Sequence, residues 1–195
     1  MNRPVRNPNP QSKPAAGLLE LDDFSIRAIG AGDFPTLRSF VESTPAGVFE
    51  LPVTERAFQA FAGGLVRKPW SLPFLCFREG RPVGMCLMSI AQVKNLNAYL
   101  VALFSVPAEA TLPLAMYIRH AFWSFPLHRL YAQLPATAAV IPHVSILERV
   151  GFEHEGILSA HVESAEGPQD AIVVGLLRDE FNLWCEQNEP RLALG

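Results

Sequence analysis

The order of apolar and polar residues along the chain predicts a mixture of strands and helices. Positions 24–29 alternate apolar and polar, as in a strand with one buried face. Two apolar runs at 74–78 and 83–90 flank a short Gly/Pro turn, which predicts a hairpin, and a third run follows at 97–104. We therefore expect three consecutive strands in the middle of the chain, paired antiparallel.

Four further segments place apolar residues at the spacing of an amphipathic helix. They are residues 37–41, 54–65, 112–125 and 144–150. Asp33 can cap the first of these helices and Pro35 suits its first turn, whereas Gly151 stands just past the end of the last, where glycine is favoured.

Three more strands are predicted in the second half of the chain, at 129–134, 152–162 and 170–177. The resulting order is β-α-α-β-β-β-α-β-α-β-β. Such an order favours an α+β fold (α/β mixed), with a central mixed, mostly antiparallel sheet flanked by helices.

Length and composition suit one domain. The chain has 195 residues, of which 49% are hydrophobic and 18% charged, enough for a well-filled core. Residues 1–17 hold four prolines and no apolar h-region, so we expect a flexible leader rather than a secretion signal, followed by one domain at 18–195. No apolar run approaches the ~18 residues that a membrane-spanning helix needs. A cytoplasmic location without membrane contact is expected.

Charge and cysteine content argue against several classes of function. A net charge of −3 disfavours non-specific binding to nucleic acid, which depends on neutralising phosphates. The three cysteines form no CxxC pair, so neither a disulfide framework nor a zinc site is indicated. The motifs of zinc peptidases and P-loop enzymes do not occur, and we expect no metal.

The second half of the chain carries short motifs that resemble a known family. They are Ala121-Phe122, Leu127-His128-Arg129-Leu130-Tyr131-Ala132, Ile146-Leu147-Glu148-Arg149-Val150-Gly151-Phe152, Glu155-Gly156-Ile157-Leu158, Asp170, and Gly175-Leu176-Leu177-Arg178-Asp179-Glu180-Phe181. With the order of elements, they resemble the GNAT acyltransferase superfamily and its RimJ/RimL-type N-acetyltransferases over residues 24–181. The resemblance implies a GNAT fold, in which the sheet is splayed between its fourth and fifth strands, here 97–104 and 129–134.

The resemblance also implies a donor site for acetyl-CoA or another acyl-CoA. In this family the donor lies in the split, and backbone N–H groups of a glycine-rich loop at the start of the next helix hold its pyrophosphate. Counting back from Phe122 gives the implied donor-binding residues, which are Leu103, Phe104, Ser105, Ala108, Ala110 and Thr111.

The donor loop departs from the family pattern. The segment 105–110 contains no basic residue and no glycine. Pro107 and Pro113 remove N–H groups, and Glu109 brings a negative charge to the expected place of the pyrophosphate. A second family motif, an Asn three residues before a Ser, falls on Val140 and His143.

Three functions therefore stay open. The first is an N-acyltransferase that moves an acetyl or other small acyl group from a thioester donor, acyl-CoA foremost, to a primary amine of a small molecule or a protein N-terminus. The second is an amide-forming transferase whose donor is an aminoacyl-tRNA or an acyl carrier protein. The third is a catalytically silent binding module with the same fold.

The usual general acid of the family, a tyrosine in the helix before the Gly-Phe turn, is missing from residues 145–148. His143, Ser145 and Cys86 are the candidate substitutes. His143 stands near the helix start beside the expected donor cleft, and an ordinary histidine titrates near pH ~6.5, where acid or base work is feasible. Its alternative role is a surface or capping histidine.

Candidates for the acceptor side come from two places. Tyr99 and Asn97 alternate on the central strand and are candidates to face the acceptor, with packing as the alternative for Tyr99. Glu50 follows the first helix, where a carboxylate can bind a substrate ammonium or simply be solvated.

Overall fold

The computed structural model describes residues 18–43, 56, 58, 60, 62–64, 71–92, 95–137, 140–163 and 167–193. The expected leader, 1–17, and Glu50 lie outside the described residues. The strands are β1 (Leu19–Leu21), β2 (Phe24–Ala28), β3 (Ser71–Arg78), β4 (Arg81–Gln92), β5 (Asn97–Phe104), β6 (Arg129–Pro135), β7 (Glu153–Val162) and β8 (Gln169–Leu177). The helices are α1 (Phe34–Glu42), α3 (Thr111–Ser124), α4 (Ile141–Arg149) and α5 (Arg178–Asn188), with short 3₁₀ turns η1 (Ala31–Asp33), η3 (Pro107–Glu109) and η4 (Pro190–Leu192).

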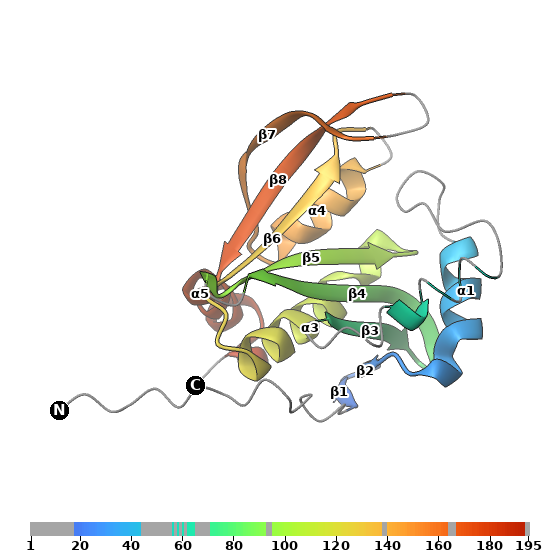
Figure 1. Ribbon diagram of the computed structural model, residues 1–195. Helices are drawn as coiled ribbons and strands as arrows, with labels where there is room; N and C mark the ends of the chain where they lie inside the picture. The colour runs from blue at the N-terminus through green and yellow to red at the C-terminus, as the bar shows by residue number, and fades with distance from the viewer. Residues whose placement is uncertain are drawn as a thin grey trace.

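All eight described strands belong to one sheet, in the order β1-β2-β3-β4-β5-β6-β8-β7. Every neighbouring pair is antiparallel except β5 and β6, which are parallel. Parallel neighbours require a crossover, and α3 supplies it between β5 and β6. The mixed, mostly antiparallel sheet expected from the sequence is confirmed (Figure 1).

The sheet buries a different core on each face. On β3, Phe74 and Cys76 belong to the larger cluster, which includes residues of α3, α4 and α5, whereas Leu75 and Phe77 belong to a smaller cluster with residues of α1. Successive residues of a strand point to opposite faces, so this division follows directly from the alternation. Because both faces of the sheet are covered at β3, its residues are apolar at successive positions instead of alternating with polar ones.

The close approach of β4 and β5 requires a glycine at position 84. Gly84 pairs with Phe104, and a Cβ added to Gly84 would lie 2.3 Å from the Phe104 ring. A methyl group does not fit there, so glycine is required by packing at a position of regular strand. The aromatic ring of Phe104 thereby lies directly against the backbone of β4.

The structure corrects two details of the sequence-based prediction and supplies one boundary. Helix α4, whose final part was predicted at 144–150, begins at Ile141, where Pro142 suits its first turn. Asp33 does not cap α1: its carboxylate accepts the N–H of Gly30 at 2.9 Å and pairs with Arg27 at 2.6 Å. Helix α5 was not predicted, and it begins where the backbone N–H of Leu177 donates to Glu180.

Among the residues described, no helix is both long and apolar enough to cross a membrane.

Candidate functional site

The parallel strands β5 and β6 stay together only at their amino ends. Three residue pairs join them: Asn97 with Arg129, Ala98 with Leu130, and Tyr99 with Tyr131. Beyond these pairs β5 continues beside β4 and β6 continues beside β8, so the two strands separate toward their carboxyl ends (Figure 1). The β5 edge from Leu100 onward therefore faces the split instead of a neighbouring strand of the described sheet.

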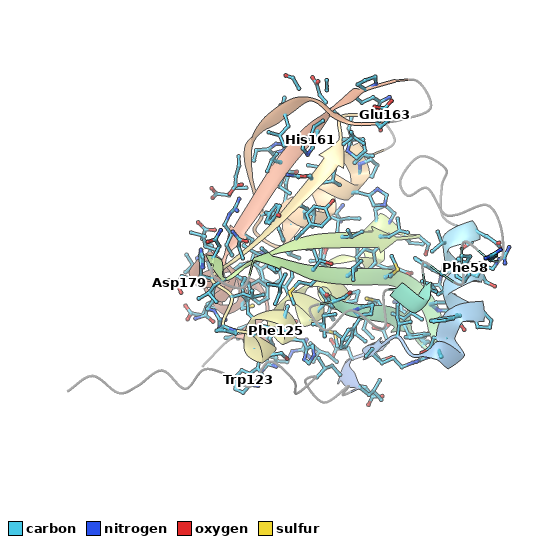
Figure 2. All side chains as sticks on the ribbon, viewed as in Figure 1. Phe58, Trp123, Phe125, His161, Glu163 and Asp179 are labelled. Atoms are coloured by element: carbon cyan, nitrogen blue, oxygen red, sulfur yellow. The ribbon has the colours of Figure 1, made fainter. Side chains whose placement is uncertain are left out.

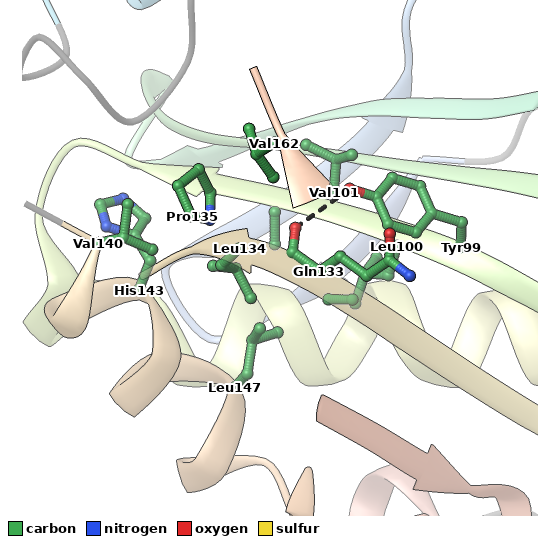
Figure 3. Close-up of a pocket in the computed structure, with 12 residues that line it drawn as sticks. Tyr99, Leu100, Val101, Gln133, Leu134, Pro135, Val140, His143, Leu147 and Val162 are labelled. Carbon is green, nitrogen blue, oxygen red and sulfur yellow. Dashed lines mark hydrogen bonds between the residues drawn. The ribbon is translucent and has the colours of Figure 1, made fainter. Parts of the chain in front are cut away.

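A pocket of about 210 Å³ lies in this split (Figure 3). Its walls come from β5, β6, α4 and the end of β7, through Tyr99, Leu100, Val101, Ala102, Ala132, Gln133, Leu134, Pro135, Val140, His143, Leu147 and Val162. Because strand residues alternate, the lining residues of β5 include members of both sheet faces. The pocket thus opens between the strands rather than on one side of the sheet.

His143 is the polar residue on the α4 side of this pocket. His143 is 5% exposed, and among the described residues no other residue of the polar or charged class is buried. Burial lowers the pKa of His143 from its usual 6.5, and the nearby backbone of Phe104 offsets part of that shift. Neither ring nitrogen makes a well-formed hydrogen bond within the described residues. A buried imidazole without partners is costly, and this one is neutral with a donor and an acceptor to offer.

Tyr99 lies at the opposite end of the pocket from His143 (Figure 3). Its hydroxyl donates to the backbone carbonyl of Gln133 at 3.2 Å, and its ring packs edge-on against Tyr131 at 5.5 Å. Burial, followed by the neighbouring Tyr131, raises the pKa of the Tyr99 phenol, so the hydroxyl keeps its proton. The side chain of Gln133 in turn contacts His161 Nε2 through Oε1 at 3.2 Å.

His161 belongs to the β7–β8 arm, which rises beyond the end of β6 (Figure 2). Together with Tyr99 and Gln133 it forms a polar group beside the pocket, hereafter the Tyr99 cluster. Tyr99 stands at one end of the pocket and His143 at the other. The arrangement can hold two different groups whose reacting atoms meet between the strands.

The turn η3 follows the open end of β5. The carboxylate of Glu109 there accepts from Arg78 at 2.9 Å and from Arg81 at 3.1 Å. On the other side, Arg149 of α4 donates to the backbone carbonyl of Pro107 at 3.4 Å. Three arginines distant in sequence thus surround a loop that has no basic residue of its own.

Comparisons with known proteins agree with this geometry. No protein-family model matches the chain, and no curated protein matches it either. Solved structures do match, among them Mycobacterium smegmatis RimJ in complex with CoA-disulfide, at 21% identity and a TM-score of 0.66 over 80% of this chain and 83% of that one. The ribosomal-protein-S5-alanine acetyltransferase from Vibrio fischeri matches at 14% identity, 85% and 98% coverage and a TM-score of 0.70. The chain has the GNAT fold.

A further GNAT structure that matches comes from Salmonella typhimurium, an acetyltransferase that modifies the N-terminal serine of ribosomal protein L7/L12. It is 12% identical, covers 80% of this chain and 95% of its own, and has a TM-score of 0.69. Since these identities are low, the likeness establishes the fold, and the site must be argued from this chain's residues.

Within the GNAT fold, two of the residues expected to be catalytic line the pocket: His143 and Tyr99. Ser145, the third, is half-buried on α4 and does not contribute to the lining. Asn97 lies at the closed end of β5, where it pairs with Arg129, two positions before Tyr99. Cys86 is fully buried, and burial raises the pKa of its thiol, which makes it inert.

The residues expected to bind the donor lie next to the pocket instead of in its lining. Leu103 and Phe104 point into the two cores, Ser105 donates to Val83, and Ala108, Ala110 and Thr111 belong to the turn and the start of α3. Their backbone can still contribute, but their side chains do not reach the pocket.

Sequence reasoning missed Gln133, His161 and Arg149 as members of the site. Gln133 alternates with pocket-lining apolar residues on β6, which is the one signal that could have drawn attention to it. Among the described residues, His, Cys, Asp and Glu side chains nowhere gather in a group of three that could hold a metal ion.

Proposed function

We propose that this chain is an N-acyltransferase, which moves a small acyl group from a thioester donor to a primary amine. The observation that carries the proposal is the separation of β5 from β6 after three residue pairs, with a pocket in the gap. In a GNAT fold the donor can bind along the unpaired edge of the strand in this gap. The gap is open on both faces of the sheet, so the acceptor can enter from the face opposite the donor. Polar groups at both ends of the pocket complete the arrangement.

The edge of β5 suits a donor with an extended amide-bearing arm. Backbone N–H and C=O groups from Leu100 onward have no strand partner on that side, and an arm with amides can pair with them as an added strand does. Acyl-CoA carries such an arm, and when bound it supplies the acyl group as an activated thioester. A β5 N–H directed at the thioester carbonyl would stabilise the charge that develops there.

His143 is proposed to hold the donor arm. Its imidazole is neutral at pH 7, because burial lowers its pKa, and a neutral ring is a poor proton donor in catalysis but a good hydrogen-bonding group. Neither of its nitrogens makes a well-formed hydrogen bond within the described residues, although the backbone of Phe104 lies close to the ring. A hydrogen bond to the bound arm would remove the cost of burying it. Ser145 remains a weaker candidate for the same task.

The Tyr99 cluster is proposed to receive the acceptor amine. An amine must be uncharged when it attacks, so a group that takes its proton has to stand nearby. His161 can do so through the nitrogen that does not contact Gln133, and the Tyr99 hydroxyl fixes the wall of the site against Gln133. Asn97 and Glu50 keep their proposed place among residues that shape acceptor binding.

The acceptor is proposed to be the amino group of a protein N-terminus or of a small molecule. Several of the matching GNAT structures are named for the acetylation of ribosomal proteins, which favours a protein N-terminus. A cytoplasmic location belongs to the same proposal, since the donor and such acceptors occur there.

The test is acyl transfer by the full chain. Purified protein is incubated with acetyl-CoA and a panel of peptides with different N-terminal residues and small primary amines, and products are found by mass spectrometry. An acetylated amine that forms only with the protein supports the proposal. If neither acetyl-CoA nor an acetylated carrier protein reacts or binds, and aminoacyl-tRNA also fails, the proposal is wrong and a binding module is favoured.

A further inference from the structure

The turn that should hold the donor's pyrophosphate has few N–H groups left to offer. Positions 105–113 include two prolines, Pro107 and Pro113, which carry no N–H. Three more amides already donate to carbonyls of the protein, at 3.0, 3.0 and 3.4 Å, namely those of Ser105, Glu109 and Ala110. Five of the nine backbone nitrogens are thus missing or engaged. The four that remain, at 106, 108, 111 and 112, are interrupted by the prolines and the engaged amides, so the turn offers a depleted set of the free amides that bind phosphate at a helix N-terminus.

The same turn holds a carboxylate in place. Glu109 is only 17% exposed, and its two oxygens are bound by Arg78 and Arg81. Arg78 is also paired with Asp23 at 2.6 Å. The carboxylate adds a negative charge beside any pyrophosphate bound at this turn, while the two cations next to it are already paired with carboxylates.

Among the described residues, Arg149 is a third cation that contacts the turn. Its guanidinium donates to the carbonyl of Pro107 and so joins the end of α4 to η3. It tethers the outer end of the split by a contact between protein groups. To bind a phosphate it would have to give up this contact, and it would act alone.

The other half of a coenzyme A molecule meets a different environment. The β5 edge beyond Tyr99, the pocket and the unpartnered imidazole of His143 are all available for an extended amide-bearing arm. The site therefore fits the pantetheine arm and its thioester, and does not fit the nucleotide.

Because the pocket suits the pantetheine arm and the turn does not suit the pyrophosphate, we infer that the donor site recognises an acylated pantetheine arm. It gains almost no affinity from the nucleotide of coenzyme A. The inference rests on the proposed function, because it specifies the donor of that same reaction. Three donors share this chemistry: acyl-CoA, an acyl carrier protein with its phosphopantetheine, and a free acyl-pantetheine. All three present the same arm to the split.

Calorimetry tests the inference without turnover. Coenzyme A and pantetheine are each titrated into the full-length protein, and the expected dissociation constants agree within about tenfold. Coenzyme A binding should also depend little on salt, since few phosphate contacts form. Binding of coenzyme A more than tenfold tighter than pantetheine overturns the inference but leaves the proposed acyl transfer standing. Binding of neither ligand overturns the inference, and the transfer assay with an acetylated carrier protein then decides whether the proposed acyl transfer stands.

Variants of the turn are expected to bind coenzyme A more tightly, a result that misfolding of the protein would not produce. Pro107→Gly with Glu109→Gly restores an N–H and removes the carboxylate, so coenzyme A should bind at least tenfold tighter while pantetheine binding stays unchanged. Unchanged coenzyme A binding by a variant with a normal melting curve contradicts the inference. Arg149→Ala is the matched control: it should weaken both ligands equally or neither, and a selective loss of coenzyme A binding would show that Arg149 holds a phosphate.

A kinetic comparison separates the three donors. Acetyl-CoA, acetyl-pantetheine and an acetylated carrier protein are offered with the same amine, and kcat/KM is measured for each. Similar values for the first two support the inference, and a much higher value for the carrier protein identifies it as the source of the arm. A preference for acetyl-CoA beyond tenfold contradicts it.

Discussion

The hydroxyl of Tyr99 donates a hydrogen bond to the backbone carbonyl of Gln133, across the point where β5 and β6 have already separated. Tyr99 belongs to the last residue pair of the two strands, and Gln133 lies two residues beyond that pair on β6. The Tyr99 side chain thus joins β5 and β6 one step beyond the last pair of residues that the backbone connects. Tyr99 also lines the inner end of the pocket, and the Gln133 side chain makes a separate contact with His161.

Replacing Tyr99 with Phe tests this connection. The variant loses one hydrogen bond and leaves a carbonyl at the pocket without its partner, so the free energy of unfolding should fall by about 0.5–1.5 kcal/mol. We expect KM for the amine to rise more than kcat falls, because the cluster binds the acceptor. A KM for the amine that equals that of the wild type would mean that Tyr99 has only a packing role.

His143 should act through hydrogen bonding and not as a general acid. His143→Gln keeps an amide donor and acceptor, so donor affinity should remain within about tenfold of the wild type. His143→Ala leaves a cavity without a donor and should weaken donor binding more. Calorimetry with coenzyme A and with pantetheine checks both variants.

The dependence of kcat on pH provides a separate measure of the His143 role. Because burial lowers the pKa of His143, no ionisation of this residue should appear in the profile above pH ~6.5. A loss of 10²-fold or more in kcat for His143→Gln, with an ionisation that disappears in the variant, would show true general acid–base catalysis.

One buried and one half-buried histidine should make the protein sensitive to mild acid. Burial lowers the pKa of both His143 and His120 from the usual 6.5, with Arg119 adding to the effect on His120. Below pH ~6.5 the unfolded chain binds protons that the folded chain does not, so stability falls with falling pH in this range. The free energy of unfolding in urea should be lower at pH 5.5 than at pH 7.5.

The choice of these two pH values separates histidines from carboxylates. Carboxyl groups whose pKa is lowered by ion pairs, such as Asp33, lose their contribution only below their usual values near 4. His143→Gln combined with His120→Gln should reduce the difference between pH 5.5 and pH 7.5. An undiminished difference in the double variant would assign the acid sensitivity to other groups.

Gly84→Ala should destabilise the fold without touching the pocket. The new methyl group would lie 2.3 Å from the Phe104 ring and 3.1 Å from the Leu103 carbonyl, so the ring or the strand must shift. Overpacking of this kind costs about 1–3 kcal/mol, which lowers the melting temperature by roughly 2–10 °C for a domain of this size. Gly32→Ala, which has no atom within 4 Å of the added Cβ, is the control and should melt as the wild type does.

Much of the fold could be predicted from the sequence because its strands are strongly patterned. The limits of β5, Asn97 and Phe104, agree with the apolar run from which that strand was predicted. Helix α5 escaped prediction because only Phe181 and Cys185 are buried on it, and its other residues, apart from Leu183 and Trp184, are polar. The spacing of apolar residues indicates which positions are buried, so a mostly exposed helix shows little of the pattern that predicts a helix.

The site was predictable only in part, since its contacts join distant segments. The position of His143 beside the cleft followed from its place near the start of α4. The negative charge of Glu109 was evident in the sequence, but its partners Arg78 and Arg81 come from a hairpin 28 to 31 residues earlier. Likewise, Gln133 and His161 are 28 positions apart in the sequence, so no local pattern shows their contact.

Three residue pairs are all that the ladder contributes to joining the two parts of the sheet, β1–β5 and β6–β8. The width of the gap is therefore governed by the apolar side chains wedged beneath it, including Val140, Leu147 and Leu134. Trimming or enlarging these residues would change the length of acyl chain that the protein accommodates and leave the polar ends of the pocket intact. Selectivity for the transferred group is in this sense a property of helix packing.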